Sequence, residues 1–544
     1  MRIAIHVLCV LIGVSSPGAS QDNKIVPADK KAFSDARNIS DPQAKIDALR
    51  RFVAQYPKSS RADTANSLIL ETLVKKFPNR TGEIERQVKT ILKPAKDEFR
   101  MYDYDDVAST LAEGNVLLPL AERISQKSLK MLHEKTYTAT VQKQYVHAKM
   151  TPPNRADLHR EYQKAHSSLQ ATLGRIYLKQ GKTTAAESIL KAAYADDPDN
   201  SAAAADLGML AAGRGESDQA LTFLTRARLT GKLDDSQQKK LQDLYAQKYG
   251  NSSAFEDYLD QRYALLFPLP FEAIKYQATG KASDRTVLEE IFTGSGCAPC
   301  AGADLAIDAD LERYSRKDVA VLAFDQHIPE PDPLANPDSV RRFDFYKANG
   351  TPTLAIDGTT KIIGADRASA KARFEEINKL VDKALQVPAE ARIQLTAWRD
   401  GDRIQVRTSA ANIKTDSKDL KLQIALVEER LRYSGENGIR FHRMVVRSIA
   451  GNDCFPVEPG KDSSIQYTFD VQKISDGLKS YLDAYEKSND RFGPITFIQK
   501  MYTINPADLS VVAFVQDIKT KHVLQAAYVR VPPVSANVSM NDKQ

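Results

Sequence analysis

The stretch that decides the fold of the C-terminal half reads Thr293-Gly294-Ser295-Gly296-Cys297-Ala298-Pro299-Cys300. An apolar run, 287–292, precedes it, and a segment with helical spacing, 301–314, follows it. We therefore expect a cysteine pair where a strand meets a helix N-terminus. Partial positive charge at that terminus stabilises the thiolate, which is the reactive form of cysteine. Pro299 suits a first helical turn, where its missing N–H has no cost.

The composition is that of a soluble protein with several domains. The chain has 544 residues, of which 27% are charged and 42% are hydrophobic, and this length exceeds one ordinary domain. The net charge is only +6, from 76 basic and 70 acidic residues. Because no basic stripe is interleaved with aromatic residues, the sequence gives no indication of nucleic-acid binding.

Residues 1–20 have the pattern of a secretory signal peptide. Arg2 is followed by an apolar run, 3–14, and then by small residues that suit cleavage. A buried N-terminal strand and an uncleaved anchor are the alternatives, but the run is short for a membrane span. We expect an exported mature chain, periplasmic or extracellular, without a transmembrane segment; association with an outer membrane is compatible with this.

Four cysteines restrict the chemistry. Cys9 lies in the signal peptide, so the mature chain keeps Cys297, Cys300 and Cys454. Three cysteines are too few for a disulfide-rich scaffold, and a close pair in a long chain indicates redox or metal chemistry. Cys454 is predicted to be a loop thiol.

Residues 28–277 are predicted to be helical, because alanine, leucine, lysine and glutamate dominate and β-branched alternation is rare. Within 167–232 a pattern recurs after 34 residues. The matching pairs are Leu173 and Leu207, Gly174 and Gly208, Gly181 and Gly215, Ala186 and Ala220, Leu190 and Leu224, and Ala193 and Ala227. This period resembles the tetratricopeptide repeat, which stacks helix pairs into a curved array. The resemblance implies a concave surface for a protein or peptide partner; a packing spacer is the alternative. A linker is expected at 278–285.

Residues 286–387 alternate between strand and helix patterns. We expect strands and helices over 286–292, 301–314, 319–324, 339–347, 352–356, 361–363 and 370–385. Asp357-Gly358 predicts a tight hairpin turn between the last two strands.

This order resembles the thioredoxin fold. The resemblance rests on Cys297-Ala298-Pro299-Cys300 together with Gly350-Thr351-Pro352-Thr353-Leu354. It implies that Pro352, preceded by Thr351, is cis and lies against the cysteine pair. Gly296 and Ile291 stand where thioredoxin has a tryptophan and a buried aspartate, and 329–338 is a proline-rich insertion. The opening from Glu289 to Cys297 is more similar to exported thioredoxin-fold proteins that carry a further β domain.

Thiol–disulfide exchange is the mechanism that this spacing predicts. Cys297, nearer the helix start and expected to be more exposed, would be the nucleophile, and Cys300 would resolve the mixed disulfide. Asp304 and Asp308 would oppose thiolate formation. Glu289 or Glu290 would accept a proton from Cys300, although an exposed strand carboxylate is the alternative for each.

Two other interpretations of the pair stay open. A copper site from Cys297, Cys300 and His327 is the metal alternative, and a purely structural disulfide is the other. We favour neither, and expect no metal and no bound organic cofactor.

Residues 388–534 are predicted to form a β-sandwich-like domain with a polar tail at 535–544. Strand patterns occur at 393–398, 403–409, 421–428, 444–448, 465–469, 511–516 and 523–531, with a helix at 475–487. Sequence segments such as 438–447 resemble the β domain that accompanies the thioredoxin fold in those exported proteins. His442 is predicted to be a surface strand residue.

The sequence thus predicts a multidomain chain: an all-α helical repeat, an α/β thioredoxin-like domain and a β-sandwich-like domain. The leading functional hypothesis is an exported oxidoreductase that exchanges with protein dithiols or disulfides. A binding or assembly scaffold is the alternative, and a copper carrier is the third.

Overall fold

The computed structural model describes residues 28–93, 98–147, 152–250, 253–278, 284–362, 364, 366–451, 455–489 and 491–532. The chain forms two compact units, which meet in sequence between residues 266 and 267, and residues 487–495 belong to the first unit. The predicted signal peptide, the predicted tail and Cys454 lie outside the described residues.

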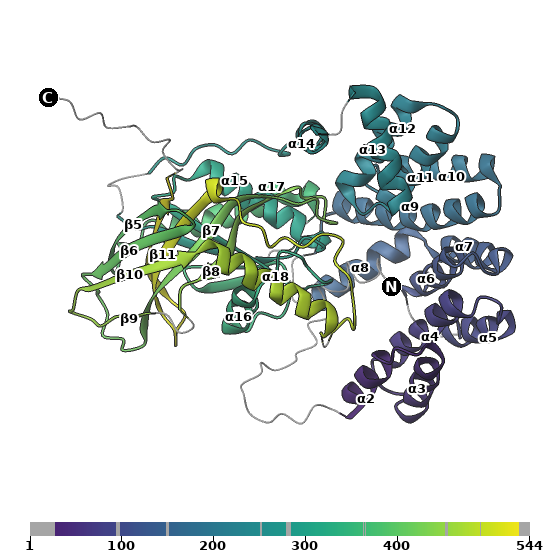
Figure 1. Cartoon of the computed structure of the whole chain (residues 1–544), viewed down its shortest axis with the longest axis horizontal. Helices are drawn as coiled ribbons and strands as arrows, with labels where there is room; N and C mark the ends of the chain where they lie inside the picture. The colour runs from purple at the N-terminus through teal and green to yellow at the C-terminus, as the bar shows by residue number, and fades with distance from the viewer. Residues whose placement is uncertain are drawn as a thin grey trace. The chain divides into compact units, whose positions relative to one another are not determined.

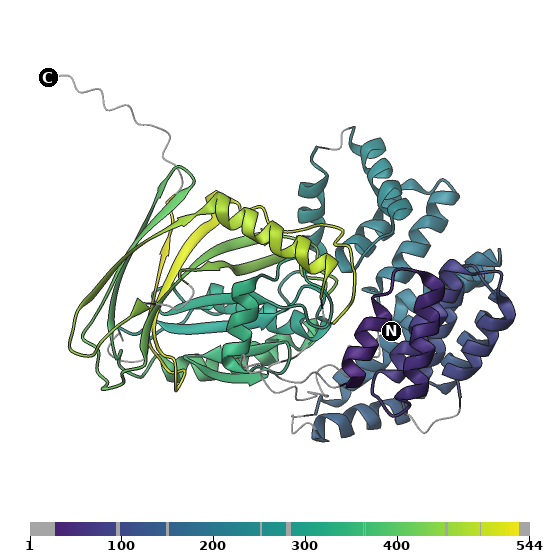
Figure 2. The same ribbon diagram turned by 60° about the horizontal axis from the view of Figure 1, so that its bottom comes forward.

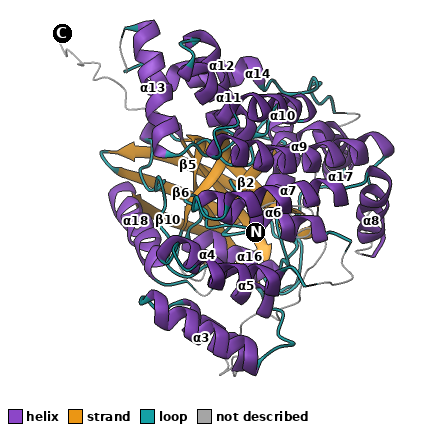
Figure 3. Cartoon of the chain, turned by 90° about the vertical axis from the view of Figure 1, so that its right-hand side faces the viewer, coloured by secondary structure: helices purple, strands orange, loops and turns teal. Residues whose placement is uncertain are grey.

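The first unit consists of paired helices, as expected for 28–277 (Figures 1 and 3). They are α2 (Ala28–Arg37), α3 (Pro42–Gln55), α4 (Ala62–Lys76), α5 (Thr81–Ile91), α6 (Arg100–Glu113), α7 (Leu118–Met131), α8 (Glu134–His147), α9 (Arg155–Lys179), α10 (Thr183–Asp196), α11 (Ser201–Gly213), α12 (Ser217–Thr230), α13 (Asp235–Tyr249) and α14 (Phe255–Leu266). Residues 487–495 join this unit through Arg37, whose guanidinium donates to the carbonyl of Arg491.

The 34-residue period corresponds to equivalent helix crossings. A Cβ on Gly174 would lie 2.6 Å from Leu190 Cγ, and one on Gly208 would lie 2.7 Å from Leu224 Cγ. Glycine therefore allows α9 to approach α10, and α11 to approach α12, in the same way. Between the helices of each pair, Gly181 and Gly215 both have positive φ.

The second unit is built on a nine-stranded mixed sheet with the order β12-β11-β7-β8-β2-β1-β3-β4, in which β9 pairs with β7 (Figure 2). Its strands are β1 (Val287–Thr293), β2 (Val319–Asp325), β3 (Thr353–Ile356), β4 (Thr359–Ile362), β7 (Leu420–Arg432), β8 (Phe441–Ile449), β9 (Phe455–Pro456), β11 (Leu509–Asp517) and β12 (Val523–Arg530). A second, antiparallel sheet has the order β10-β6-β5, from β5 (Arg392–Asp400), β6 (Arg403–Ala411) and β10 (Ser463–Asp470). The helices are α15 (Ala301–Arg313), α16 (Pro337–Tyr346), α17 (Ala370–Ala384) and α18 (Val471–Lys487).

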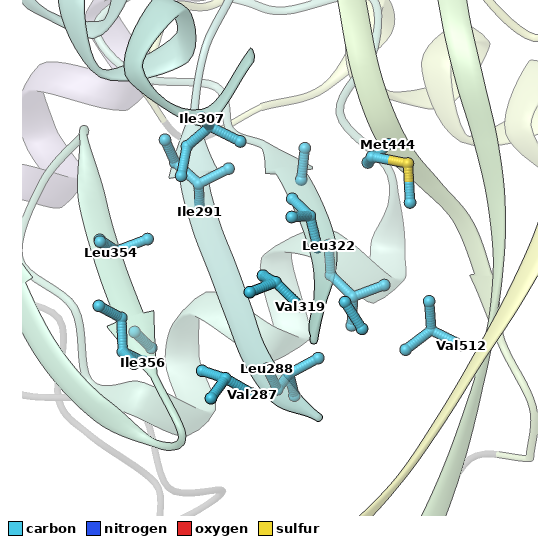
Figure 4. Close-up of a cluster of buried hydrophobic side chains, with 14 of the residues drawn as sticks. Val287, Leu288, Ile291, Ile307, Val319, Leu322, Leu354, Ile356, Met444 and Val512 are labelled. Carbon is cyan, nitrogen blue, oxygen red and sulfur yellow. The ribbon is translucent and has the colours of Figure 1, made fainter. Parts of the chain in front are cut away.

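Residues on the two sides of position 388 share one sheet and one core. β2 pairs parallel with β8, Ala323 opposite Val445. The central hydrophobic cluster includes Ile291 and Leu322, from strands before position 388, together with Met444 and Val512, from strands after it (Figure 4). The expected β-sandwich layering is present only in part, because the three-stranded sheet packs on β7 and β11, and those strands continue the sheet that contains β1. The predicted boundary at 388 therefore does not separate compact units.

The predicted Asp357-Gly358 turn is a junction between distant segments. Leu288 N–H donates to Asp357 Oδ1, and the Arg285 guanidinium donates to Asp357 Oδ2 at 2.7 Å. A Cβ on Gly358 would lie 1.8 Å from the carbonyl oxygen of Lys521, so only glycine allows the two turns to meet. Arg285, the last residue of the expected linker, is buried here.

The repeat crossing makes a stability prediction. We expect Gly208→Ala to lower the free energy of unfolding by about 1–3 kcal/mol, because the new methyl overlaps Leu224. Gly213→Ala is the matched control on α11, since its surroundings are open; it should leave stability unchanged or raise it by up to about 1 kcal/mol. Urea denaturation measures both, and equal stabilities would contradict the proposed close packing.

Candidate functional site: a disulfide beneath two loops

Cys297 and Cys300 form a disulfide at the end of β1. A single 3₁₀ turn, Ala298–Cys300, contains Pro299 and leads into α15. This is the predicted strand-to-helix junction, with the proline in the first turn, where no N–H is needed.

Thr351 lies against the cysteine pair, directly before Pro352 in the chain. The Thr351–Pro352 peptide bond is cis. The buried Thr351 hydroxyl donates to Cys297 Sγ at 3.4 Å and also lies 3.3 Å from the carbonyl oxygen of Ile328. The structure thus brings together three of the predicted site residues, Cys297, Cys300 and Thr351, and Pro352 follows Thr351 through the cis peptide bond.

Both sulfur-bearing residues are covered, which corrects the expectation that Cys297 is the more exposed. Cys297 is 1% exposed and Cys300 is 0% exposed. Two loops account for this: 326–336, in the proline-rich insertion, and 433–439, between β7 and β8. Glu330 from the first loop lies beside Gly296, since a Cβ added to Gly296 would be 3.6 Å from Glu330 Cβ. Asn437 from the second donates its backbone N–H to the carbonyl of Ser295 at 2.9 Å.

The insertion loop is fixed by polar contacts to the cysteine turn. The Asp332 carboxylate accepts from the N–H groups of Ser295 and Leu334. The Asp332 N–H donates to His327 Nδ1 at 2.9 Å, and His327 Nε2 lies 2.9 Å from the Tyr481 hydroxyl. Since both ring nitrogens of His327 have protein partners, ligation of copper would break one of these bonds.

Glu290 holds a buried ion pair on the α16 face of the sheet. Arg342 donates to both carboxylate oxygens, at 2.6 and 2.9 Å, and the Tyr346 hydroxyl donates as well. Glu290 is 0% exposed, so the alternative of an exposed strand carboxylate is wrong. Among the described residues, no contact links Glu290 with the cysteines.

Glu289 faces the opposite side of β1 and is also fully buried. Its carboxylate oxygens, like those of Asp310 on α15, have no hydrogen-bond partner among the described residues. Burial raises the pKa of Glu289 to about 8, a rise that the charge of Arg316 opposes. Burial and the neighbouring Glu289 raise the pKa of Asp310 well above its usual value. The alternative of an exposed carboxylate is wrong here too.

Three further carboxyl groups surround the C-terminal ends of β1 and β2. The Thr293 hydroxyl donates to Asp304 at 2.7 Å, and Thr293 is opposite Asp325 in the sheet. Burial raises the pKa of Asp304 to about 8 and that of Asp308 to about 7. These two carboxyls are therefore partly or mostly neutral near pH 7, and they oppose thiolate formation less than full charges would.

Asp325 is the most enclosed of this group. It is 1% exposed, and neither carboxylate oxygen has a hydrogen-bond partner among the described residues. Burial, followed by the charges of Asp332 and Asp304, raises the pKa of Asp325 well above its usual value.

A cavity of about 20 Å³ is lined by Asp304, Asp308 and Asp325 together with Ile291 and His442. That volume has room for about one water molecule. Ile291 occupies the position of the missing aspartate, so carboxyl groups from α15 and β2 reach the space beside it. His442 is buried rather than on the surface as predicted, and burial lowers its pKa to about 4.

Sequence reasoning missed Asp325, Asp332 and Asn437 as site residues. Asp325 had a usable signal, because it ends a strand parallel to β1 and the carboxyl ends of parallel strands meet at one edge. Asn437 had no such signal in the sequence, since its loop is brought to the site by the pairing of β8 with β2, which are distant in the chain.

Comparison with protein-family models matches residues 177–245 to the tetratricopeptide repeat. The matched segment runs from within α9 into α13, and it supports a role for the helical unit in protein–protein interaction. A search of curated proteins gives no match. Among the described residues, no helix is long and apolar enough to cross a membrane.

The adjacent glutamates of β1 should respond oppositely to neutralisation. We expect Glu290→Gln to cost about 3–5 kcal/mol of unfolding free energy, because it leaves the Arg342 guanidinium buried without its ionic partner. Glu289→Gln, the matched control one residue away, should be neutral or stabilising at pH 8, since it removes an unpaired buried carboxyl. Guanidinium denaturation at pH 8 measures the unfolding free energy of both variants. A Glu290→Gln protein as stable as the parent would contradict the assignment of Glu290 to a buried ion pair.

Asp304 predicts a pH dependence of stability. Its folded-state pKa, about 8, lies above the ordinary 3.8. The folded state therefore binds more protons than the unfolded state between about pH 4 and pH 8, and stability falls as pH rises through that window, by at most about 1.4 kcal/mol per unit from this group. Asp304→Asn should reduce the slope of unfolding free energy against pH. An unchanged slope would show that Asp304 titrates normally.

Proposed function

We propose that this chain is an exported protein thiol–disulfide oxidoreductase. Its Cys297–Cys300 pair exchanges with cysteines of a protein that the helical repeats help to dock. One observation carries the proposal: the disulfide stands at the end of β1, with the Thr351 hydroxyl against Cys297 and a cis peptide bond between Thr351 and Pro352.

The arrangement of the elements from β1 to β4 supports a thioredoxin-like fold around that pair. β1 pairs parallel with β2 and antiparallel with β3, and β3 pairs antiparallel with β4. The cysteines occupy the β1–α15 junction, and the hairpin that follows cis-Pro352 is β3–β4. The predicted export supports a compartment in which disulfides persist.

The exchange conserves atoms and electrons. A substrate thiolate attacks Cys297 Sγ, the Cys297–Cys300 bond breaks, and the electron pair leaves on the Cys300 sulfur. A second substrate thiolate then attacks the substrate sulfur of the mixed disulfide and releases Cys297, so the substrate is oxidised and the pair is reduced. The reverse sequence reduces a substrate disulfide, and the relative reduction potentials set the direction.

The carboxyl cluster near the pair supplies groups for proton transfer. Asp304, with its pKa raised to about 8, is matched to a thiol of ordinary pKa about 8.5, and such matching favours proton transfer between the two. We assign this role to Asp304 with Asp325 rather than to Glu290, whose carboxylate is committed to Arg342.

Access to Cys297 needs movement of the two covering loops. Glu330 and Asn437 are the residues that close over the turn. A docked substrate would therefore displace part of 326–336 or 433–439 before its thiolate reaches the sulfur.

Alkylation of the reduced protein across pH tests the proposal. Cys297 should react faster than an ordinary free cysteine at pH 7, and the pair should show a defined reduction potential in glutathione buffers. A Cys297→Ser/Cys300→Ser variant gives the background from Cys454. If Cys297 reacts no faster than a free cysteine and the pair has no measurable potential, the proposal fails. Cys300→Ala should trap the substrate as a mixed disulfide.

A binding or assembly scaffold is the second candidate, and the burial of both cysteines favours it. In that case Cys297→Ser leaves the cellular role intact, while deletion of residues 167–232 abolishes it. Loss of the role in the double serine variant, with the fold retained, would exclude the scaffold.

A further inference from the structure

An apolar groove with a basic rim lies within the first unit, away from the segment matched to the tetratricopeptide repeat. Its volume is about 360 Å³. α5, α6 and α7, with the residues just after α5, line it through Val88, Leu92, Tyr104, Leu120 and Ile124, which form the apolar floor.

Four cations surround this floor. Lys89 and Lys93 come from the end of α5 and the residues after it, and Arg123 and Lys127 come from α7. Arg123 and Lys127 are four residues apart within α7, which places both side chains on one helical face, while Lys93 follows just beyond the end of α5. Lys127 Nζ also lies 4.8 Å from the centre of the Tyr104 ring.

Lys89, Lys93 and Lys127 have no carboxylate partner within the part of the chain that the structure describes, whereas Arg123 interacts electrostatically with the neighbouring Glu122. Elsewhere on the same unit, exposed basic residues are commonly paired, as Arg50 is with Glu83 and Lys182 is with Glu122. Three unpaired positive charges beside an apolar floor therefore leave a complementary negative partner to be supplied from outside.

We propose that this groove binds an acidic peptide segment of a partner protein, with one large apolar side chain inserted between flanking carboxylates. The cations on α5 and α7 would meet acidic residues on either side, while Tyr104 and Ile124 contact the inserted side chain. The volume lies at the lower end of the roughly 300–1,000 Å³ typical of small-ligand pockets, which suits one or two side chains. This binding is independent of the thiol chemistry proposed above.

A fluorescence anisotropy titration of the full chain tests the groove. The probe is a fluorescein-labelled peptide with one phenylalanine between runs of glutamate. Lys89→Glu/Lys127→Glu should weaken its binding by at least about tenfold, a loss of about 1.4 kcal/mol or more. Raising the ionic strength from about 0.01 M to about 0.15 M should also weaken binding, because screening shortens the range of the charges.

The matched control is Arg86→Glu/Lys130→Glu, which reverses the same number of charges on the same two helices outside the groove. Both residues are exposed and neither lines the cavity, so binding should change by less than about threefold. Far-ultraviolet circular dichroism of both double variants checks that the helices remain folded.

The peptide provides the second arm. Replacement of its phenylalanine by serine should weaken binding by about tenfold if the apolar floor is used. Equal loss in the two double variants, or no effect of the serine peptide, would overturn the proposal. Absence of peptide binding together with Lys89- and Lys127-dependent binding of phosphatidylglycerol vesicles would also overturn it, in favour of an anionic lipid.

Discussion

The ion pair between Glu290 and Arg342 fixes the strand on which the cysteine pair stands. From it a buried polar chain continues through Tyr346 to Gln516, which accepts from Gln423 at 2.8 Å. The chain therefore ties β1 and α16 to β7 and β11. Buried charge is tolerated only when its hydrogen bonds are satisfied, so β1 and the C-terminal strands must assemble together, and the end of β1 is positioned by residues more than a hundred positions away in sequence.

This constraint makes the C-terminal strands part of the site. β8 lies beside β2, and the loop that precedes β8 places Asn437 over Ser295. The proline-rich insertion closes the other side through Asp332. A β domain attached by a linker alone would leave the disulfide open. Here the loop between two strands that complete the core also contacts the cysteine turn, through Asn437 and Ser295.

Local sequence patterns were sufficient for the elements and for the cysteine junction. The helical repeat could be predicted because Gly174 and Gly208 face Leu190 and Leu224 at equivalent helix crossings. Small residues at a fixed period can be recognised without information from distant segments of the chain. The order of the sheet was not readable, since the pairing of Ala323 with Val445 joins segments with no shared periodicity. The exposed-carboxylate alternative for Glu289 and Glu290 was wrong for a related reason. A strand buried on both faces has no alternating pattern, and the arginine that satisfies Glu290 lies on another element.

The two adjacent glutamates of β1 have different surroundings on the two faces of the sheet. On the α16 face, Glu290 is held by Arg342 and Tyr346 in a network of hydrogen bonds. On the α15 face, Glu289, Asp304 and Asp325 are carboxyl groups whose pKa values are raised by burial. The pKa values of Glu289 and Asp304, about 8, bring proton exchange by these two groups close to neutral pH, and it is this face that continues into the cysteine turn. The proposed proton transfer at the disulfide is therefore assigned to residues from α15 and β2, in the space beside Ile291, rather than to Glu290.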